Sequence, residues 1–218
     1  HGGRISAVIN EHLRREAPDL SVVGIVDPDR EGATARLPQS DRADVRFYDS
    51  LGDMVRAARL DALAIGTRCN LHAPYAIEAA AYVLPLFLEK PVAINMEQAL
   101  ALEDAFADST CNAVVSFPLR VSPICEMARQ QIANGAVGSP EHVLGVNYVP
   151  YGTVYFDNFY RDYASTQGLF IQKATHDFDY LMYLMGSPIV RIAALSTCGH
   201  IFGGVKPAGL RCSACPEA

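Results

Sequence analysis

Short, continuously apolar segments alternate with segments of helical periodicity through the first half of the chain. Apolar runs without polar alternation are typical of strands buried on both faces of a parallel sheet. They occupy residues 20–26, 45–48, 61–65, 84–88 and 112–117. Apolar residues with helical spacing occur before and between these runs, over residues 5–13, 51–58, 72–82 and 96–107. Asn95 is the predicted N-cap of the last of these helices, and Gln98 is placed as in a capping box. This alternation predicts an α/β fold with a Rossmann-type, doubly wound parallel sheet.

The pattern changes after Phe117. We predict a helix over residues 123–133, a strand over 142–149, a loop rich in aromatic residues, a helix over 168–184 and a strand-like run over 189–195. These elements indicate a second, α+β domain that is unfinished at the C-terminus. We therefore expect a first domain over residues 1–118 and a second domain over residues 119–218.

Composition excludes several classes of protein. Half of the 218 residues are apolar and the formal net charge is −6, which excludes a disordered chain and disfavours nucleic acid or an anionic membrane surface as the main partner. No apolar stretch is long enough to cross a bilayer, and no basic segment leads into an apolar one at the N-terminus. Six cysteines scattered through apolar segments favour a reducing, cytoplasmic setting.

Residues that follow the predicted strands are the first candidates for ligand contacts, because ligands of such sheets bind at the carboxyl ends of the strands. Asp27 ends the first predicted strand, about twenty residues after Gly2 and Gly3, which precede a helix starting near Arg4. This spacing suits an adenosine ribose on Asp27 and a pyrophosphate on the helix N-terminus. A tight turn and a loop-capping aspartate would give the same residues. Glu89, Lys90 and Pro91 follow another strand, where a lysine would point into the crevice.

A polar stripe runs along the predicted helix over residues 168–184. Gln172, His176, Asp179 and Tyr180 share one side at i, i+4, i+7 and i+8, while apolar residues can pack another side. The stripe suits the wall of a pocket. A histidine satisfied within a core is the alternative interpretation.

Together these residues resemble the Gfo/Idh/MocA oxidoreductase family, the group of glucose–fructose oxidoreductase and inositol dehydrogenase. The matching features, in order along the chain, are Val26-Asp27-Pro28-Asp29, Gly66-Thr67 with Leu71-His72, Glu89-Lys90-Pro91, Ser116-Phe117 with Arg120 and Pro123, Asn134-Gly135-Ala136-Val137-Gly138, Tyr160-Arg161-Asp162 and His176-Asp177-Phe178-Asp179. The resemblance implies that the second domain carries a large, open, mostly antiparallel sheet. It also implies a homo-oligomer formed through that sheet.

The resemblance further implies hydride transfer between NAD and a sugar, polyol or related cyclic alcohol. It makes residues 1–118 the dinucleotide-binding domain and residues 119–218 the substrate-binding domain. By this analogy Lys90 and His176 are catalytic, since a histidine can take up the hydroxyl proton and a lysine ammonium can stabilise alkoxide charge. The implied cofactor contacts are Gly2, Gly3, Arg4, Ile5, Asp27, Arg30, Thr67, His72, Glu89 and Lys90. The implied substrate contacts are Lys90, Arg120, Tyr160, Arg161, Gln172, Lys173 and His176. Asp27 favours NAD because a carboxylate repels a 2′-phosphate, and Arg30 leaves NADP open.

Two positions depart from the family pattern. Gln172 stands where many members have an aspartate, and an amide cannot relay a proton at neutral pH. Arg68 replaces the usual proline after Thr67 and would place an extra donor near the cofactor. Two other activities of the family stay open, a hydride-cycling glycosidase and a non-catalytic NAD-binding sensor.

The aromatic loop over residues 148–163 and the C-terminal cysteines each allow two interpretations. The loop would stack on a sugar ring, with Arg161 binding a hydroxyl or carboxylate, or it is a surface loop anchored by buried rings. Cys212 and Cys215 have zinc spacing, with Cys198 and His200 upstream, but two free thiols are the preferred interpretation and we expect no metal. Because His1 falls within the predicted phosphate-binding turn, we expect both ends of the chain to be cut, with the first strand of the sheet lying before His1.

Overall fold

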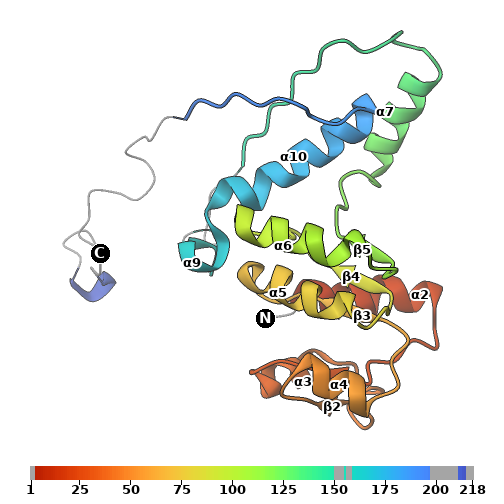
Figure 1. The fold of residues 1–218 in the computed structure, drawn as a ribbon, viewed down its shortest axis with the longest axis vertical. Coiled ribbons are helices and arrows are strands. Elements are labelled where there is room, and N and C mark those ends of the chain that lie inside the picture. Colours follow the sequence, from red (N-terminus) through yellow and green to blue (C-terminus); the bar gives the residue numbers. More distant parts are fainter. Residues whose placement is uncertain (1–2, 150–154, 156–158, 197–210, 215–218) are drawn as a thin grey trace. The chain divides into compact units, whose positions relative to one another are not determined.

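The structure is a computed structural model that describes residues 3–149, 155, 159–196 and 211–214. The chain divides into two compact units, His1–Gly186 and Ser187–Ala218. The first unit contains all five described strands and nearly all of the described helices (Figure 1). In the second unit, residues 187–196 are described without a helix or strand, and a short 3₁₀ helix, η3, spans Cys212–Ala214.

The central feature of the first unit is a three-stranded parallel sheet. Its strands are β3 (Leu63–Ile65), β4 (Leu86–Leu88) and β5 (Ala113–Val115), in the order β3-β4-β5. Leu63 pairs with Leu86, and Leu86 pairs with Ala113. Helices α5 (Cys69–Ala80) and α6 (Met96–Ala107) make the crossovers and pack against each other. The predicted parallel α/β architecture is therefore confirmed.

A separate pair of parallel strands, β1 (Gly24–Ile25) and β2 (Arg46–Phe47), forms a second sheet. Among the described residues no strand bridges β1 and β3, so the five strands do not form the single sheet that the pattern predicts. All five strands also are shorter than the apolar runs that contain them. Apolar content marks a buried segment, whereas a strand is assigned only where a neighbour completes the backbone hydrogen bonds.

Helix boundaries follow local capping chemistry closely. Asn95 accepts a hydrogen bond from the Gln98 N–H at 2.8 Å and begins α6, while Gln98 Oε1 accepts from the Ile94 N–H at 3.1 Å. Ser122 caps α7 (Pro123–Ala133), so the predicted ranges of α6 and α7 are confirmed. Ser50 caps α4 (Leu51–Ala57) in the same way.

Helix α3 (Arg30–Arg36) was not predicted, and neither was the short α9 (Tyr163–Thr166). Asp29 accepts a hydrogen bond from the Gly32 N–H and begins α3. Its sequence, REGATAR, has no apolar stripe, so only the cap residue signalled it.

The N-terminal helix is continuous but irregular. It runs as α1 (Gly3–Ala7), a π-helical turn η1 (Val8–Leu13) and α2 (Arg14–Glu16). Near its end, Arg14 forms an ion pair with buried Asp41, which also accepts a hydrogen bond from the Val22 N–H. The aspartate thereby joins this helix to the segment that leads into β1.

One apolar core joins α4, β3, β4, α5 and α6. It contains Leu51, Met54, Leu63, Ile65, Ala73, Ala76, Ala79, Leu86, Leu88 and Leu102. Ala73, Ala76 and Ala79 of α5 are fully buried, which lets this helix pack closely against the sheet and against α6. The core therefore lies under the strand ends that carry the candidate site.

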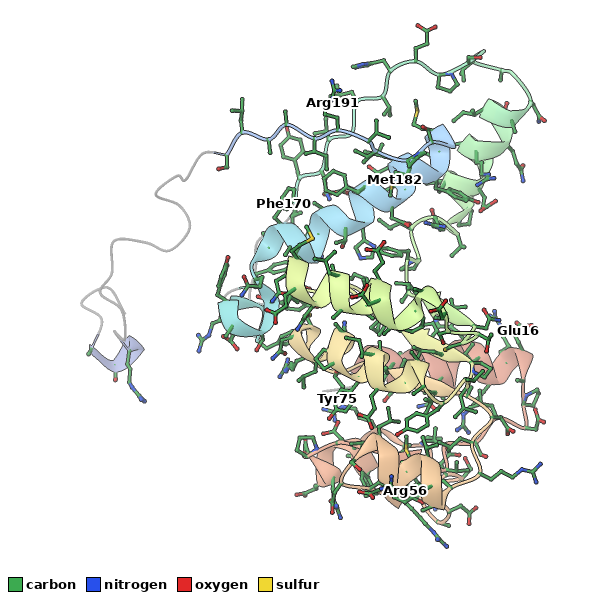
Figure 2. The ribbon with its side chains drawn as sticks, viewed as in Figure 1. Glu16, Arg56, Tyr75, Phe170, Met182 and Arg191 are labelled. Carbon is green, nitrogen blue, oxygen red and sulfur yellow. The ribbon has the colours of Figure 1, made fainter. Side chains whose placement is uncertain are left out.

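The C-terminal part of the first unit is helical. After α7 come η2 (Phe159–Arg161), α9 (Tyr163–Thr166) and α10 (Leu169–Met185), and α10 contacts both α7 and α9 (Figure 1). Phe170 and Met182 lie toward opposite ends of α10 (Figure 2). Gly186 takes a left-handed conformation, φ 63°, and its N–H closes α10 on the Met182 carbonyl, as glycine at a helix end commonly does.

The two strands predicted for the second half are not seen among the described residues. Residues 142–149 are extended, and Leu144, Val146 and Tyr148 are 80%, 62% and 90% exposed. Residues 189–195 also lack a described strand partner, and Val190 is 92% exposed. Their apolar alternation suits a sheet face, but no neighbouring strand is described for either segment.

Candidate active site at the carboxyl edge of the sheet

The carboxyl ends of β3, β4 and β5 meet at one edge, which brings together residues that are far apart in the sequence. The Glu89 N–H donates to the Ile65 carbonyl at 3.0 Å, and the Ser116 N–H donates to the Leu88 carbonyl at 2.9 Å. Thr67, Glu89 with Lys90, and Ser116 therefore leave the sheet side by side. Parallel strands and the crossovers between them produce this convergence.

Lys90 connects this edge to α10. Its side chain is buried, with 6% of the residue exposed, and its Nζ donates a 2.8 Å hydrogen bond to the Gln172 carbonyl oxygen. The Lys90–Pro91 peptide bond is cis. Gln172 lies one helical turn before His176, so the ammonium of one predicted catalytic residue meets the helix that carries the other.

The Gln172 side chain is occupied by protein groups. Its Nε2 donates to the Thr166 carbonyl at 3.2 Å, its Oε1 accepts from the Cys69 thiol at 3.5 Å, and 2% of the residue is exposed. Burial raises the pKa of the Cys69 thiol, which keeps it protonated as the donor. In this arrangement Gln172 holds α10 against α5, rather than presenting its amide to a substrate hydroxyl as the resemblance implied.

His72 positions the turn that carries Lys90. Its Nδ1 lies 2.7 Å from the Pro91 carbonyl oxygen and its Nε2 lies 3.2 Å from the Thr67 carbonyl oxygen. Burial lowers the pKa of His72, outweighing the two carbonyl contacts and the nearby Glu89 carboxylate, which raise it. Both ring nitrogens face backbone carbonyl oxygens, so His72 holds the turns after β3 and β4 in place and does not direct a ring nitrogen toward the predicted cofactor site.

His176 borders a cavity of about 470 Å³. Its ring makes an edge contact with Phe117, with centroids 5.9 Å apart and planes at 90°. The cavity is lined by Val8, His12, Ser116, Pro118, Leu119, Asn147, Val149, Lys173, His176 and Asp177. Asn147 Nδ2 donates to both carboxylate oxygens of Asp177 at 3.0 Å. Polar groups thus converge beside His176 in a space large enough for a small ligand.

Besides His176, the sequence predicted one polar residue of this cavity, Lys173, and missed another, His12. Lys173, a predicted substrate contact, lines the cavity and also lies with Nζ 5.1 Å from the centre of the Tyr155 ring. His12 was not predicted. It lies four residues after Val8, on the face of the helix that is otherwise apolar. A histidine on that apolar face was the feature of the sequence that could have indicated a role in the site.

Arg120 and Asp179 form an ion pair between the segment after β5 and helix α10. Arg120 Nε donates to Asp179 Oδ2 at 3.0 Å and Nη2 donates to Oδ1, and this pairing raises the pKa of Arg120. Asp179 is 7% exposed at its side chain and Arg120 is 43% exposed. The guanidinium that was predicted to bind substrate therefore contacts α10. It joins that helix to the segment that follows β5.

The predicted dinucleotide contacts lie on several elements. Asp27 follows β1 and accepts a 2.8 Å hydrogen bond from the Asp29 N–H, while Arg30 pairs with Asp49 at 2.6 Å. Ile5 packs on the end of β3, where a Cβ added to Gly66 would lie 2.8 Å from the Ile5 Cβ. Gly2 lies outside the described residues. Gly3 and Arg4 begin α1, with their side-chain surroundings undescribed.

The aromatic segment of η2 packs against the N-terminus of α5. The Phe159 and Tyr160 rings stack with centroids 4.2 Å apart, and Tyr155 lies 5.4 Å from Tyr160. The Arg68 guanidinium lies over the Phe159 ring, 3.8 Å from its centre. Tyr160 is half-buried and Arg161 is exposed, so both remain predicted substrate contacts.

Two buried polar atoms at the first turn of α5 fit the binding of a polar cofactor. Arg68 Nη1, a donor, and Asn70 Oδ1, an acceptor, are both buried without a hydrogen-bond partner among the described residues. Buried polar groups are ordinarily paired, so such atoms at a strand's carboxyl end suit a ligand rich in hydroxyl and phosphate oxygens, as NAD is. The residues present are consistent with a dinucleotide at this edge.

The described part of the chain contains neither a cluster of metal-ligating side chains nor a helix that could span a membrane. Within residues 3–149, 155, 159–196 and 211–214 no three metal-ligating side chains gather. Cys198, His200 and Cys215 lie outside the described residues. Nor is any described helix long and apolar enough to span a bilayer.

Comparison with known proteins identifies the family. The model described as "Oxidoreductase family, NAD-binding Rossmann fold" matches residues 2–117, and that of the "GFO/IDH/MocA C-terminal domain" matches residues 125–203. Rhizopine catabolism protein MocA of Rhizobium meliloti is 25% identical over 206 residues, which cover 94% of this chain and 61% of that protein. The scyllo-inositol 2-dehydrogenase (NAD(+)) of Bacillus subtilis (strain 168) is 25% identical over 201 residues, covering 88% of this chain and 54% of that enzyme.

Solved structures support the same fold. The WlbA dehydrogenase from Bordetella pertussis, in complex with NADH and UDP-GlcNAcA, aligns with a TM-score of 0.68 at 23% identity, covering 86% of this chain and 57% of that one. A myo-inositol dehydrogenase from Corynebacterium glutamicum aligns with a TM-score of 0.64 at 22% identity, covering 84% and 53%. The chain spans little more than half the length of such relatives. It belongs to the Gfo/Idh/MocA family of oxidoreductases with an NAD-binding Rossmann fold.

Proposed function

We propose that the protein containing this chain is an NAD-dependent dehydrogenase that oxidises a CH–OH group of a sugar, polyol or related cyclic alcohol. Residues 1–118 would bind the dinucleotide and residues 119–218 would contribute the substrate-binding part. The relatives named above, which include inositol dehydrogenases, support this reaction class.

The observation that carries the proposal is the hydrogen bond between Lys90 Nζ and the Gln172 carbonyl oxygen. It ties a buried ammonium at the end of β4 to α10, one turn before His176. A buried cation near a histidine at the carboxyl edge of a parallel sheet suits proton transfer beside a cofactor.

The proposed chemistry divides the work between two side chains. When bound, the nicotinamide ring supplies the hydride acceptor. His176 takes the proton of the substrate hydroxyl as the carbinol becomes a carbonyl, and returns it in the reverse direction. The Lys90 ammonium stabilises negative charge on the same oxygen.

The proposal also covers the choice of cofactor, the cellular setting and the assembly of the protein. Asp27 at the end of β1 supports NAD over NADP, since a carboxylate accepts ribose hydroxyls and repels a 2′-phosphate, and Arg30 is engaged by Asp49. The free thiols of Cys69, Cys111 and Cys125 support a reducing, cytoplasmic setting. A homo-oligomer formed through the second domain's sheet remains part of the proposal on the resemblance alone.

The test compares wild type with Lys90→Met and His176→Asn in the full-length protein. With NAD and a panel of inositols, hexoses and hexitols, wild type should form NADH, and each variant should lose about 100-fold or more in kcat, the usual contribution of a positioned acid, base or charge. NADH affinity, followed by its fluorescence, should change far less for His176→Asn. NAD binding without turnover on any panel member, or full activity in both variants, would refute the assignment.

A further inference from the structure

Arg68 is an unusual cation at the carboxyl edge of the sheet. It follows Thr67 after β3 and occupies the N-cap position of α5. Its guanidinium is half-buried and lies 3.8 Å from the centre of the Phe159 ring. Stacking of a guanidinium on an aromatic face restricts its plane and favours the charge, so its donors point in defined directions.

One of those donors lacks a partner. Nη1 is buried and makes no hydrogen bond among the described residues. A buried donor of a charged group ordinarily finds an acceptor, because an unmade bond leaves its desolvation uncompensated. A ligand that brought an acceptor to Nη1 would recover that free energy.

The carboxylate of Asp162 does not pair with Arg68. Asp162 lies within electrostatic range of the guanidinium. Its carboxylate is instead engaged by the Ala164 N–H and the Ser165 hydroxyl, which begin α9. No ion pair to Arg68 occurs in the described part of the chain.

A second cation, the buried Lys90, lies near Arg68. Lys90 and Arg68 both act electrostatically on the Cys69 thiol, which places two cations around one buried side chain. The buried Glu89 carboxylate and Asp162 bring negative charge to the same region, so Arg68 is distinguished by a donor without a partner in the described part of the chain and not by a net positive charge. Paired, preorganised donors of this kind suit oxyanions, and the arginine fork suits carboxylate and phosphate oxygens in particular.

We propose that Arg68 binds an oxyanion of the ligands that occupy this edge, through Nη1 and with its plane held by Phe159. The oxyanion belongs either to the cofactor diphosphate or to a carboxylate on the substrate. In the second case the substrate is an acidic sugar or polyol rather than a neutral one. The inference rests on the proposed function for the identity of the ligands, and on Arg68 alone for their charge.

The test uses two substitutions that differ mainly in charge. Arg68→Met keeps an unbranched, apolar side chain for packing on Phe159, while Arg68→Lys keeps the charge. Arg56→Met is the matched control, because Arg56 lies on α4 and its side chain is 72% exposed (Figure 2). Circular dichroism of all three should match wild type before binding is compared.

Binding is measured on the full-length protein by calorimetry, without turnover. The probes are inorganic diphosphate, D-glucuronate and its neutral counterpart D-glucose, and NADH is titrated separately by fluorescence. Arg68→Met should weaken binding of at least one anionic probe about tenfold or more, as expected for loss of a charged hydrogen bond. Arg68→Lys should recover part of that loss, and D-glucose and the Arg56→Met control should show no comparable change.

The pattern of losses identifies the source of the oxyanion. Weaker diphosphate and NADH binding indicates the cofactor, whereas weaker glucuronate binding indicates an acidic substrate. If wild type binds neither anion, or if Arg68→Met binds both as wild type does, the inference is overturned. Failure of wild type to bind NADH, with Arg68-dependent anion binding intact, would instead overturn the proposed function.

Discussion

Breaking the ion pair between Arg120 and Asp179 should destabilise the protein measurably and leave substrate affinity nearly unchanged. Asp179→Asn keeps the shape of the side chain but removes its charge. Arg120→Met removes both donors and leaves a carboxylate that is 7% exposed without its partner. The double variant closes a thermodynamic cycle that isolates the interaction between the two residues.

The magnitude follows from the exposure of each partner. Hydrogen bonds to buried charged groups contribute about 1.5–3 kcal/mol, and fully exposed ion pairs contribute about 0–1 kcal/mol. Because Asp179 is buried and Arg120 is 43% exposed, the coupling free energy should lie near the lower end of the first range, at about 1.5 kcal/mol. For a protein of this size that corresponds to a fall in Tm of roughly 3–6 °C.

Thermal unfolding by circular dichroism provides the assay, since the sequence has no tryptophan to report by fluorescence. Glu16→Gln serves as control, because the Arg15–Glu16 pair is more than 70% exposed on both sides and should contribute less than about 0.5 kcal/mol. A rise in KM for Arg120→Met without any change in Tm would refute this reasoning. It would show that Arg120 binds substrate, as the sequence resemblance implied, rather than fixing α10.

Three further variants test the fold beneath the site. Burial lowers the pKa of His72 in the folded protein, so wild type should be fully stabilised above the ordinary histidine pKa of about 6.5 and lose stability as pH falls below it. Urea midpoints measured between about pH 7 and 5 should therefore fall less for His72→Gln, and an equal slope would contradict the assignment. Asn95→Ala removes the acceptor of the 2.8 Å bond from the Gln98 N–H and should cost about 1 kcal/mol in thermal unfolding. Gly66→Ala would place a Cβ 2.8 Å from the Ile5 Cβ and should cost about 1–3 kcal/mol, whereas an unchanged Tm would mean that α1 shifts freely.

Helix α10 is held at three points along its length, and each point belongs to a different part of the site. At residue 172, the Lys90 ammonium and the Cys69 thiol bind its backbone and side chain. At His176, the Phe117 ring packs edge-on against the imidazole. At Asp179, the helix receives Arg120. Contacts of this number keep the imidazole at a defined height beside the cavity, which a proton-transferring group requires.

Local chemistry in the sequence predicted much of the first unit. Asn95 and Ser122 mark the starts of α6 and α7 because capping acts over three or four residues of the same chain. Continuous apolar runs marked the positions of the strands for the same reason of locality, although β5 is largely exposed in the described residues, with Val114 at 58%. The helix after Asp29 was missed because its residues have no apolar stripe. Residues 142–149 were predicted to be a strand from their apolar alternation, but a strand also needs a partner strand, and none is described for them.

By itself the sequence determined the alternation of strands and helices, the family and the set of polar residues at the strand ends, since each depends on spacing along one chain. Only the tertiary structure decided how those residues are used. It directs Gln172 to Cys69 and Thr166, Arg120 to Asp179 and both nitrogens of His72 to backbone carbonyls. It also adds His12 to the cavity and leaves Arg68 Nη1 without an acceptor among the residues that the structure describes. Hydrogen-bond partners such as Cys69 and Gln172 lie 103 residues apart, and a pairing at that separation depends on packing in three dimensions, which no local pattern encodes.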